Sequence, residues 1–232
     1  MRRSDFYSSY ERFKEYHTVK ISRRNLREFD KTIWGPLQAE SRHRFLELGC
    51  GLGHMLFCLH EKGVEYFIGI DSDRRIADHL PLEIRDKFIA GDAKTFFARK
   101  RNPLPFDRVL MLDFLEHLSA EEGFQLLREL HGRTSADAKI LIRVPNAASP
   151  WGLQNQYGDV THITAYSPGS IKQVATAADW QVCSLFPHKE GSGIRRFTDT
   201  VFHGIVSALI SRPPEIWSAN FFAILEKKRG RD

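Results

Sequence analysis

The chain has few cysteines and no long hydrophobic segment, and each absence excludes a class of protein. Its three cysteines, Cys50, Cys58 and Cys183, cannot form a disulfide framework and lack the C-x-x-C spacing of zinc sites. No run of about 18 apolar residues occurs, so we expect no transmembrane helix. Residues 1–7 are charged and contain no apolar core of the signal-peptide type. These absences predict a protein of a reducing compartment, the cytoplasm.

Motifs that bind nucleotide phosphates are also missing. No Gly-Lys-Ser or Gly-Lys-Thr triplet follows a glycine-rich turn, which excludes a P-loop. A dinucleotide fingerprint that begins at Gly49 needs its third glycine at position 54, where the chain has His54. We find no internal repeat and no low-complexity segment. Hydrophobic residues make up 42% of the chain, which is enough for a folded core.

The chain is mildly basic, with a formal net charge of +5 and a pI of about 9.1. Its basic residues are dispersed rather than clustered with aromatic residues, and no nucleic-acid-binding motif is present. We therefore expect no nucleic-acid partner. The charge is compatible with an anionic substrate, with an anionic membrane surface, or with no special partner.

After residue 40, apolar runs of strand length alternate with helical segments. We expect strands at 43–48, 65–70, 86–90, 106–112, 138–144, 180–186 and 221–227, and helices at 53–62, 73–79, 120–132 and 168–178. This alternation predicts an α/β fold with a parallel sheet and helices on both faces. Residues 1–40 read as an N-terminal helical extension and 41–232 as the α/β domain, with an insertion at about 187–218 before the last strand.

The most informative segment is Leu46-Glu-Leu-Gly-Cys-Gly-Leu-Gly53, in which an apolar strand ends in three alternate glycines. Glycines lack a Cβ, so a tight turn built from them can approach a ligand closely. The next strand ends in Asp71, whose carboxylate can accept hydrogen bonds from a ribose diol. Together they predict a nucleoside-containing cofactor at the edge where the carboxyl ends of parallel strands meet.

This segment resembles the first motif of the class I S-adenosylmethionine-dependent methyltransferases, and four later segments match that family in order: Asp71, Gly91-Asp92-Ala93, residues 106–117 and residues 130–144. The resemblance covers about residues 43–186. It implies a Rossmann-like, seven-stranded, mostly parallel sheet and a methyl-transferring enzyme with S-adenosyl-L-methionine as cofactor. It also implies cofactor contacts from Glu47, Gly49, Gly51, Gly53, Asp71, Ser72, Asp92, Ala93, Asp113 and Phe114.

Purely structural roles are the alternatives for several of these residues. The glycines at 49, 51 and 53 also suit a sharp turn without a ligand. Asp71 and Asp92 also suit the capping of the helices that follow them. Asp113 also fits a loop acid without a ligand.

Residues 145–167 form a long segment rich in Asn, Gln, Thr and aromatic residues, and such segments in compact domains are usually functional. Within it, the string from Tyr157 to Pro168 is similar to one in bacterial methyltransferases encoded among cell-surface polysaccharide genes, including O-antigen and capsule clusters. That resemblance implies O-methylation of a sugar or glycan-lipid acceptor. One alternative is an O-methyltransferase of a small aromatic or quinone-like metabolite, with Trp151, Tyr157 and Tyr166 lining the site. Another is a non-catalytic assembly subunit that keeps the fold.

Methylation of a hydroxyl calls for a general base, and histidine suits that role near pH 7. We expect His162 to be the base and Asp159 to orient it, while Asp113 and His117 shape the methyl pocket. The alternatives are a loop histidine bonded to the backbone for His162 and a packing residue for His117. Because Pro145-Asn146 rather than an acid follows the fifth strand, we expect no metal.

The insertion contains an amphipathic stretch at 197–210, flanked by Arg195-Arg196 and Arg212. It fits peripheral contact with the inner face of a membrane, which would suit a lipid-linked acceptor. The alternatives are a helix that covers the sheet edge and an interface between copies of the chain in a homo-oligomer.

Overall fold

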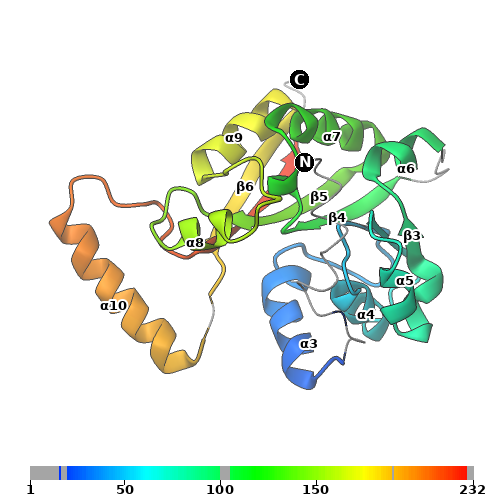
Figure 1. Ribbon diagram of the computed structural model, residues 1–232, viewed down its shortest axis with the longest axis horizontal. Helices are drawn as coiled ribbons and strands as arrows, with labels where there is room; N and C mark the ends of the chain where they lie inside the picture. The colour runs from blue at the N-terminus through cyan, green and yellow to red at the C-terminus, as the bar shows by residue number, and fades with distance from the viewer. Residues whose placement is uncertain (1–15, 17–19, 100–104, 190, 229–232) are drawn as a thin grey trace.

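The computed structural model describes residues 16, 20–99, 105–189 and 191–228, which form a seven-stranded sheet with helices on both faces (Figure 1). The strand order is β3-β2-β1-β4-β5-β7-β6. The strands are β1 (Phe45–Leu48), β2 (Phe67–Asp71), β3 (Phe88–Ala90), β4 (Phe106–Leu112), β5 (Thr134–Pro145), β6 (Trp180–Pro187) and β7 (Asn220–Lys227). Of these seven, β7 alone runs antiparallel to its neighbours. The predicted Rossmann-like, mostly parallel sheet is confirmed.

The main helices divide between the two faces of the sheet (Figure 1). One face carries α3 (Arg23–Phe29), α4 (His54–Glu61) and α5 (Ile76–His79), and the other carries α6 (Ala93–Arg99), α7 (Ala120–Arg133) and α9 (Pro168–Ala177). The remaining helical elements are η1 (Asp30–Trp34), η2 (Leu82–Lys87), η3 (Leu115–His117), α8 (Gly152–Tyr157) and α10 (Gly193–Leu209).

Alternate side chains of the central strands supply two separate cores. In β5, Ile140 and Ile142 belong to the core beneath α7 and α9, whereas Leu141 belongs to the core beneath α3 and α4. Successive strand residues point to opposite faces, so a strand covered on both faces is apolar at nearly every position. This explains why the central strands appear in the sequence as continuous apolar runs.

Local capping signals fix where two of the helices begin. The Ser119 side chain accepts from the Glu122 amide, and the Glu122 side chain accepts from the Ser119 amide, which forms a capping box before α7. Ser167 caps α9 in the same way, and Pro168 occupies the first turn. Both helices begin at the residue that the sequence predicts.

Three elements differ from the sequence-based expectations for local reasons. β5 begins at Thr134 instead of 138, because an irregularity in register lets it pair with the start of β4. The helix expected at 73–79 is confined to Ile76–His79, since the Asp73 amide is bonded to the side chain of Asp71. The segment 145–167 contains α8, whose polar sequence has no apolar face that would predict a helix.

α10 lies beside the sheet rather than on either face (Figure 1, orange). None of its residues is buried, so it does not cover the sheet edge, which was one alternative for this segment. Two hydrogen bonds connect it to the body: the Trp151 indole donates to His203 at 2.9 Å, and the Trp217 indole donates to Ser207 at 2.9 Å. Among the described helices, none is long and apolar enough to span a membrane.

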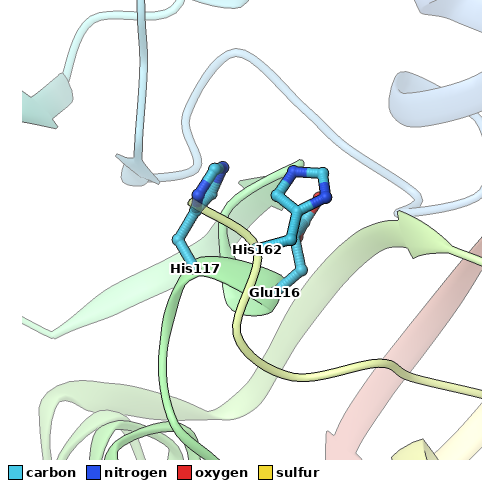
Figure 2. A group of neighbouring side chains, drawn as sticks. All are labelled: Glu116, His117 and His162. Atoms are coloured by element: carbon cyan, nitrogen blue, oxygen red, sulfur yellow. The ribbon is translucent and has the colours of Figure 1, made fainter. Parts of the chain in front are cut away.

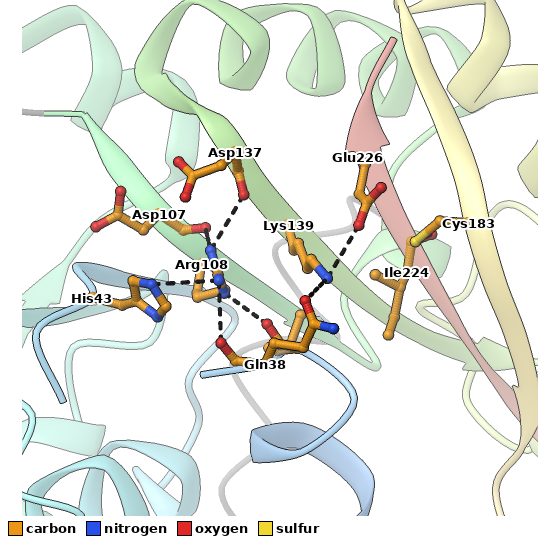
Figure 3. Close-up of polar contacts among 10 residues, drawn as sticks. Gln38, His43, Asp107, Arg108, Asp137, Lys139, Cys183, Ile224 and Glu226 are labelled. Atoms are coloured by element: carbon orange, nitrogen blue, oxygen red, sulfur yellow. Dashed lines mark hydrogen bonds and ion pairs between the residues drawn. The ribbon is translucent and has the colours of Figure 1, made fainter. Parts of the chain in front are cut away.

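A buried arginine fastens the segment after η1 to the sheet (Figure 3). Arg108 in β4 is 4% exposed and donates to the carbonyl groups of Leu37 (2.9 Å), Asp107 (2.8 Å) and Gln38 (3.3 Å). Burial, together with the nearby Arg108 charge, lowers the pKa of His43 in the same cluster. The described end of the expected 1–40 extension therefore packs onto the same body as the sheet, and residues 1–15 and 17–19 lie outside the described residues.

Replacing Arg108 with Met should lower the free energy of unfolding by about 3 kcal/mol, because the buried Leu37 carbonyl and the part-buried Gln38 carbonyl lose their donor. Urea denaturation followed by circular dichroism measures the change. Lys139→Met is the matched control: its ammonium group pairs with Glu226 at 3.1 Å near the surface of the same cluster, and such pairs contribute less than about 1 kcal/mol. Equal losses in the two variants would contradict the fastening role of Arg108.

Candidate active site

The carboxyl ends of β1, β2 and β4 surround a cavity of about 1550 Å³. Parallel strands end at one edge of the sheet, so their following loops converge there although they are distant in sequence. The predicted cofactor residues that line this cavity are Glu47, Gly49, Gly51, Asp71, Ser72, Asp92, Ala93, Asp113 and Phe114.

The glycines of the turn after β1 are required for different reasons. Gly49, Gly51 and Gly53 have φ values of +74°, +48° and +77°, a region in which other residues are strained. A Cβ on Gly49 would lie 2.7 Å from the ring of Phe114, whereas one on Gly51 would meet no atom within 4 Å. Gly49 is thus required by packing as well as by conformation, and Gly51 presents bare backbone to the cavity.

Gly53, unlike the other predicted cofactor residues, does not line the cavity, and its contact with the cofactor stays a prediction. It is the N-cap of α4, and a Cβ there would lie 2.7 Å from Leu80 and 2.8 Å from Ile84. Its positive φ turns the chain into the helix, so the structure gives Gly53 a packing role.

The carboxylate of Asp71 joins two loops of the cavity wall. One oxygen accepts from the Gly51 amide at 3.0 Å and the other from the Asp73 amide at 3.0 Å. Burial raises the pKa of Asp71, while these hydrogen bonds act in the opposite direction. Asp71 does not cap α5, which was the structural alternative, because the N-cap of that helix is Arg75, and Asp71 lines the cavity.

Glu47 is a buried acid in the cavity wall. Its side chain is 3% exposed, and its Oε2 atom has no hydrogen-bond partner among the described residues. Burial, with a further contribution from the charge of Asp71, raises the pKa of Glu47 well above its ordinary value. A buried carboxylate oxygen without a partner suits a cationic or hydrogen-donating group of a ligand.

The other two predicted cofactor-binding acids, Asp92 and Asp113, are bonded to side chains near them. Asp92 accepts from the amide and hydroxyl of Thr95 at 2.8 and 2.7 Å, which caps α6 and lowers the pKa of Asp92. The capping alternative therefore describes its side chain, although the residue lines the cavity. Asp113 has a φ of +53° and pairs with Arg143, whose Nε donates at 2.9 Å.

Tyr16 and Asp73 also line the cavity, and sequence reasoning missed both. The Tyr16 hydroxyl donates to Asp73 at 3.0 Å, and Arg75 donates to the same carboxylate at 2.7 Å. The bonds from Arg75 lower the pKa of Asp73. The position of Asp73 two residues after Asp71 was the available signal, and Tyr16 carried none.

On the opposite side of the site, η3 carries Glu116 and His117 and lies against the segment that carries His162 (Figure 2). The Glu116 carbonyl accepts from the amides of Ile163 (2.8 Å) and Thr164 (3.1 Å), which holds the two segments together. The rings of His117 and His162 meet edge to face, with their centroids 4.7 Å apart. Of these three side chains, only that of His117 lines the cavity.

Hydrogen bonds orient both imidazoles, and Asp159 takes part in those of His117. His162 Nδ1 donates to the Gln156 carbonyl at 3.0 Å. Asp159 accepts from the amide and the hydroxyl of Thr161 at 2.9 and 2.6 Å, and this hydroxyl lies 3.0 Å from His117 Nδ1. Asp159 therefore orients His117 through Thr161, and its predicted pairing with His162 stays a prediction. In the neutral form of either ring, Nδ1 carries the proton and Nε2 the lone pair.

The sequence assigns Glu116 no role of its own beyond its place in the segment 106–117. Its side chain is fully buried, and neither carboxylate oxygen has a hydrogen-bond partner among the described residues. Burial, with a smaller contribution from Asp113, raises the pKa of Glu116 to about 8. One potential ligand atom of Glu116 lies within 4.8 Å of one from each of His117 and His162. Its position next to His117 in the sequence was the signal that would have found it.

A sequence profile described as "Methyltransferase domain" matches residues 15–185. The chain belongs to this methyltransferase domain family. The match confirms the predicted class of enzyme, a methyltransferase that uses S-adenosylmethionine. It includes the cavity and both histidines and ends within β6, so α10 and β7 lie beyond it.

Solved structures of low sequence identity share the fold of this methyltransferase. A SAM dependent methyltransferase from Archaeoglobus fulgidus has a TM-score of 0.67 at 23% identity, covering 97% of this chain and 100% of that one. Magnesium protoporphyrin IX methyltransferase (ChlM) from Synechocystis PCC 6803, with bound SAH, has a TM-score of 0.62 at 12% identity, covering 98% of each chain. Peramine synthetase ppzA of Metarhizium majus (strain ARSEF 297) is 30% identical over 119 residues, which are 46% of this chain and only 4% of that protein.

Replacing Asp71 with Ala should weaken the binding of S-adenosylhomocysteine at least about ten-fold, or about 1.4 kcal/mol. The change removes the carboxylate at the cavity wall and the hydrogen bond that holds the Gly51 amide. Calorimetric titration measures the affinity, and Asp78→Ala, an exposed acid on α5 outside the cavity, is the matched control. Unchanged affinity in Asp71→Ala would place the cofactor outside this cavity.

Proposed function

We propose that this methyltransferase methylates a hydroxyl oxygen of a sugar or glycan-lipid acceptor, and that the oxygen is activated at the pair His117 and His162. The observation that carries the proposal is the position of His117. It lines the cofactor cavity and also contacts the segment after α8, where the resemblance to polysaccharide methyltransferases lies.

The cavity wall fits the cofactor on its chemistry. The backbone at Gly51 and the carboxylates of Glu47 and Asp71 face the cavity, and one oxygen of Glu47 lacks a hydrogen-bond partner there. In the proposal the Asp71 carboxylate accepts hydrogen bonds from the ribose hydroxyls of the cofactor. The Glu47 carboxylate faces the amino end of the cofactor, and Ala93 lies beside its adenine. When bound, the cofactor supplies a methyl group on a positively charged sulfur.

The residues of this chain must orient the acceptor oxygen and help it lose its proton. Orientation of reacting groups supplies up to about 7–11 kcal/mol in the best intramolecular cases, and proton transfer to a positioned base adds about 10²–10⁴-fold in rate. Hydrogen bonds fix both rings, since Gln156 holds His162 and Thr161 holds His117. A ring that is held in place loses less freedom when the acceptor binds.

The acceptor segment favours a glycan over a flat aromatic ring. Tyr166, one of the three rings of the aromatic alternative, is 1% exposed and belongs to the core. Trp151 is held by its hydrogen bond to His203 in α10, and Tyr157 is 77% exposed. These three rings therefore do not enclose a common pocket. Exposed aromatic faces beside the amides of Gln154 and Asn155 suit a sugar ring with its hydroxyl edges.

Methyl-labelled cofactor offered with nucleotide sugars, glycolipids, phenols and quinols should label a hydroxyl-rich acceptor. His117→Gln should lower kcat at least about 100-fold, since it removes the imidazole at the cavity wall. His60→Gln, an exposed histidine on α4, is the control and should leave kcat unchanged. Label found only on phenols or quinols would overturn the acceptor class.

The exposed face of α10 supports a lipid-linked acceptor. Its large exposed apolar side chains are those of Ile194, Phe197, Val201, Phe202, Ile205 and Leu209. Such a helix with arginines at its ends can lie in the interface of an anionic membrane.

The double variant Phe197→Asp/Phe202→Asp should lose binding to phosphatidylglycerol vesicles in a sedimentation assay, because it places two charges on the apolar face. The variant Phe197→Leu/Phe202→Leu keeps that face apolar and should retain binding. If the wild-type protein ignores the vesicles and is a stable dimer, the face is an interface between copies and the membrane part of the proposal fails.

A further inference from the structure

We propose that Glu116, His117 and His162 form a binding site for a divalent transition-metal cation, such as Mn²⁺ or Zn²⁺, beside the cofactor cavity (Figure 2). One potential ligand atom from each residue lies within 4.8 Å of the other two. The sequence predicts no metal, because it lacks an acid after β5. The proposal replaces that expectation with a site built from η3 and the segment after α8.

The burial of the Glu116 carboxylate is the first independent sign of a ligand. Its side chain is fully buried, and both carboxylate oxygens lack a hydrogen-bond partner among the described residues. A buried carboxylate is costly unless a hydrogen-bond donor, a proton or a cation satisfies it. Two imidazoles stand beside it, and their nitrogens are metal ligands.

The hydrogen bonds of the two histidines are the second sign. Metal-binding histidines usually donate their other ring N–H to a carbonyl or carboxylate, which fixes the tautomer. His162 Nδ1 donates to the Gln156 carbonyl, and His117 Nδ1 donates to Thr161, which in turn donates to Asp159. In their neutral forms both rings therefore carry the lone pair on Nε2, the form that coordinates a metal.

The backbone holds the ligand residues in a fixed arrangement. The amides of Ile163 and Thr164 donate to the Glu116 carbonyl, and the Thr164 hydroxyl donates to the Leu118 carbonyl at 2.6 Å. These hydrogen bonds join η3, which carries Glu116 and His117, to the segment that follows His162. Binding therefore requires little ordering of the protein, which favours affinity.

The ligand set selects the class of cation. Two imidazoles and one carboxylate suit Zn²⁺ and other first-row transition metals, whereas Mg²⁺ and Ca²⁺ prefer sites made of oxygen. Three protein ligands also leave at least one coordination position open, as in catalytic metal sites. His117, one of the three ligands, lines the cavity, so a cation held here would lie beside an acceptor bound in that cavity.

The role of this cation rests on the proposed function. A hydroxyl coordinated by the cation becomes more acidic, as metal-bound water does. In the transfer the acceptor oxygen gives its proton to solvent water and bonds to the methyl carbon. The carbon–sulfur bond breaks, and its electron pair stays on sulfur. The histidines then activate the acceptor through the cation instead of acting as free bases.

The test uses the full chain, stripped of metal with EDTA and desalted. MnCl₂ is titrated with the free-ion spin resonance signal as readout, and ZnCl₂ with calorimetry. We expect one site per chain, weakened at least ten-fold by Glu116→Gln and by His162→Asn. Glu83→Gln and His60→Asn, which alter an exposed acid and an exposed histidine, are the matched controls. MgCl₂ should compete poorly.

Binding of S-adenosylhomocysteine is measured on every variant, because neither Glu116 nor His162 lines the cavity and a folded variant should keep this affinity. A wild-type protein that binds neither Mn²⁺ nor Zn²⁺, or that binds them as well as Glu116→Gln does, overturns the metal site. Full methyl transfer by stripped protein overturns the activating role. Metal binding without any cofactor binding would instead defeat the proposed function and leave the metal site standing.

Discussion

The cavity depends on one residue at the end of β2. The carboxylate of Asp71 accepts from the amides of Gly51 and Asp73, and its backbone carbonyl accepts from the Gly91 amide at 2.8 Å. One aspartate thus connects the loops that follow β1, β2 and β3. Parallel pairing of these strands brings the loops to a common edge, and Asp71 sets how they lie against each other. The position of the Gly51 backbone in the cavity wall depends on this connection.

The cofactor half of the site could be predicted because its signals are local. An apolar strand that ends in alternate glycines, followed by a strand that ends in an acid, defines Gly49, Gly51 and Asp71 without knowledge of distant contacts. The packing role of a residue such as Gly53 could not be predicted, because it depends on contacts with distant residues. Gly53 faces Leu80 and Ile84, and this contact depends on how η2 covers α4. The central strands β1, β4 and β7 could also be predicted, since burial on both faces leaves a continuous apolar run.

The acceptor half could not be predicted in the same way. The partner of Asp159 is set by the turn at Thr161, and that of His117 by where this turn meets η3. The spacing of three residues between Asp159 and His162 therefore does not reveal the bonds that Asp159 makes to Thr161. Burial of Glu116 is also invisible in the sequence, because it follows from the backbone bonds that Ile163 and Thr164 donate to it. Side-chain roles that depend on two distant segments need the fold.

The charges around η3 explain why this end of the cavity differs from the cofactor end. The carboxyl groups of Asp113 and Asp159 both raise the pKa of Glu116, after the larger effect of burial, and Arg143 is the cation that opposes them. Arg143 is itself paired with Asp113. The carboxylates thus outnumber the cation that faces Glu116, and hydrogen bonds orient the two histidines beside it. Such a site stabilises added positive charge, and His117 connects it to the cavity wall.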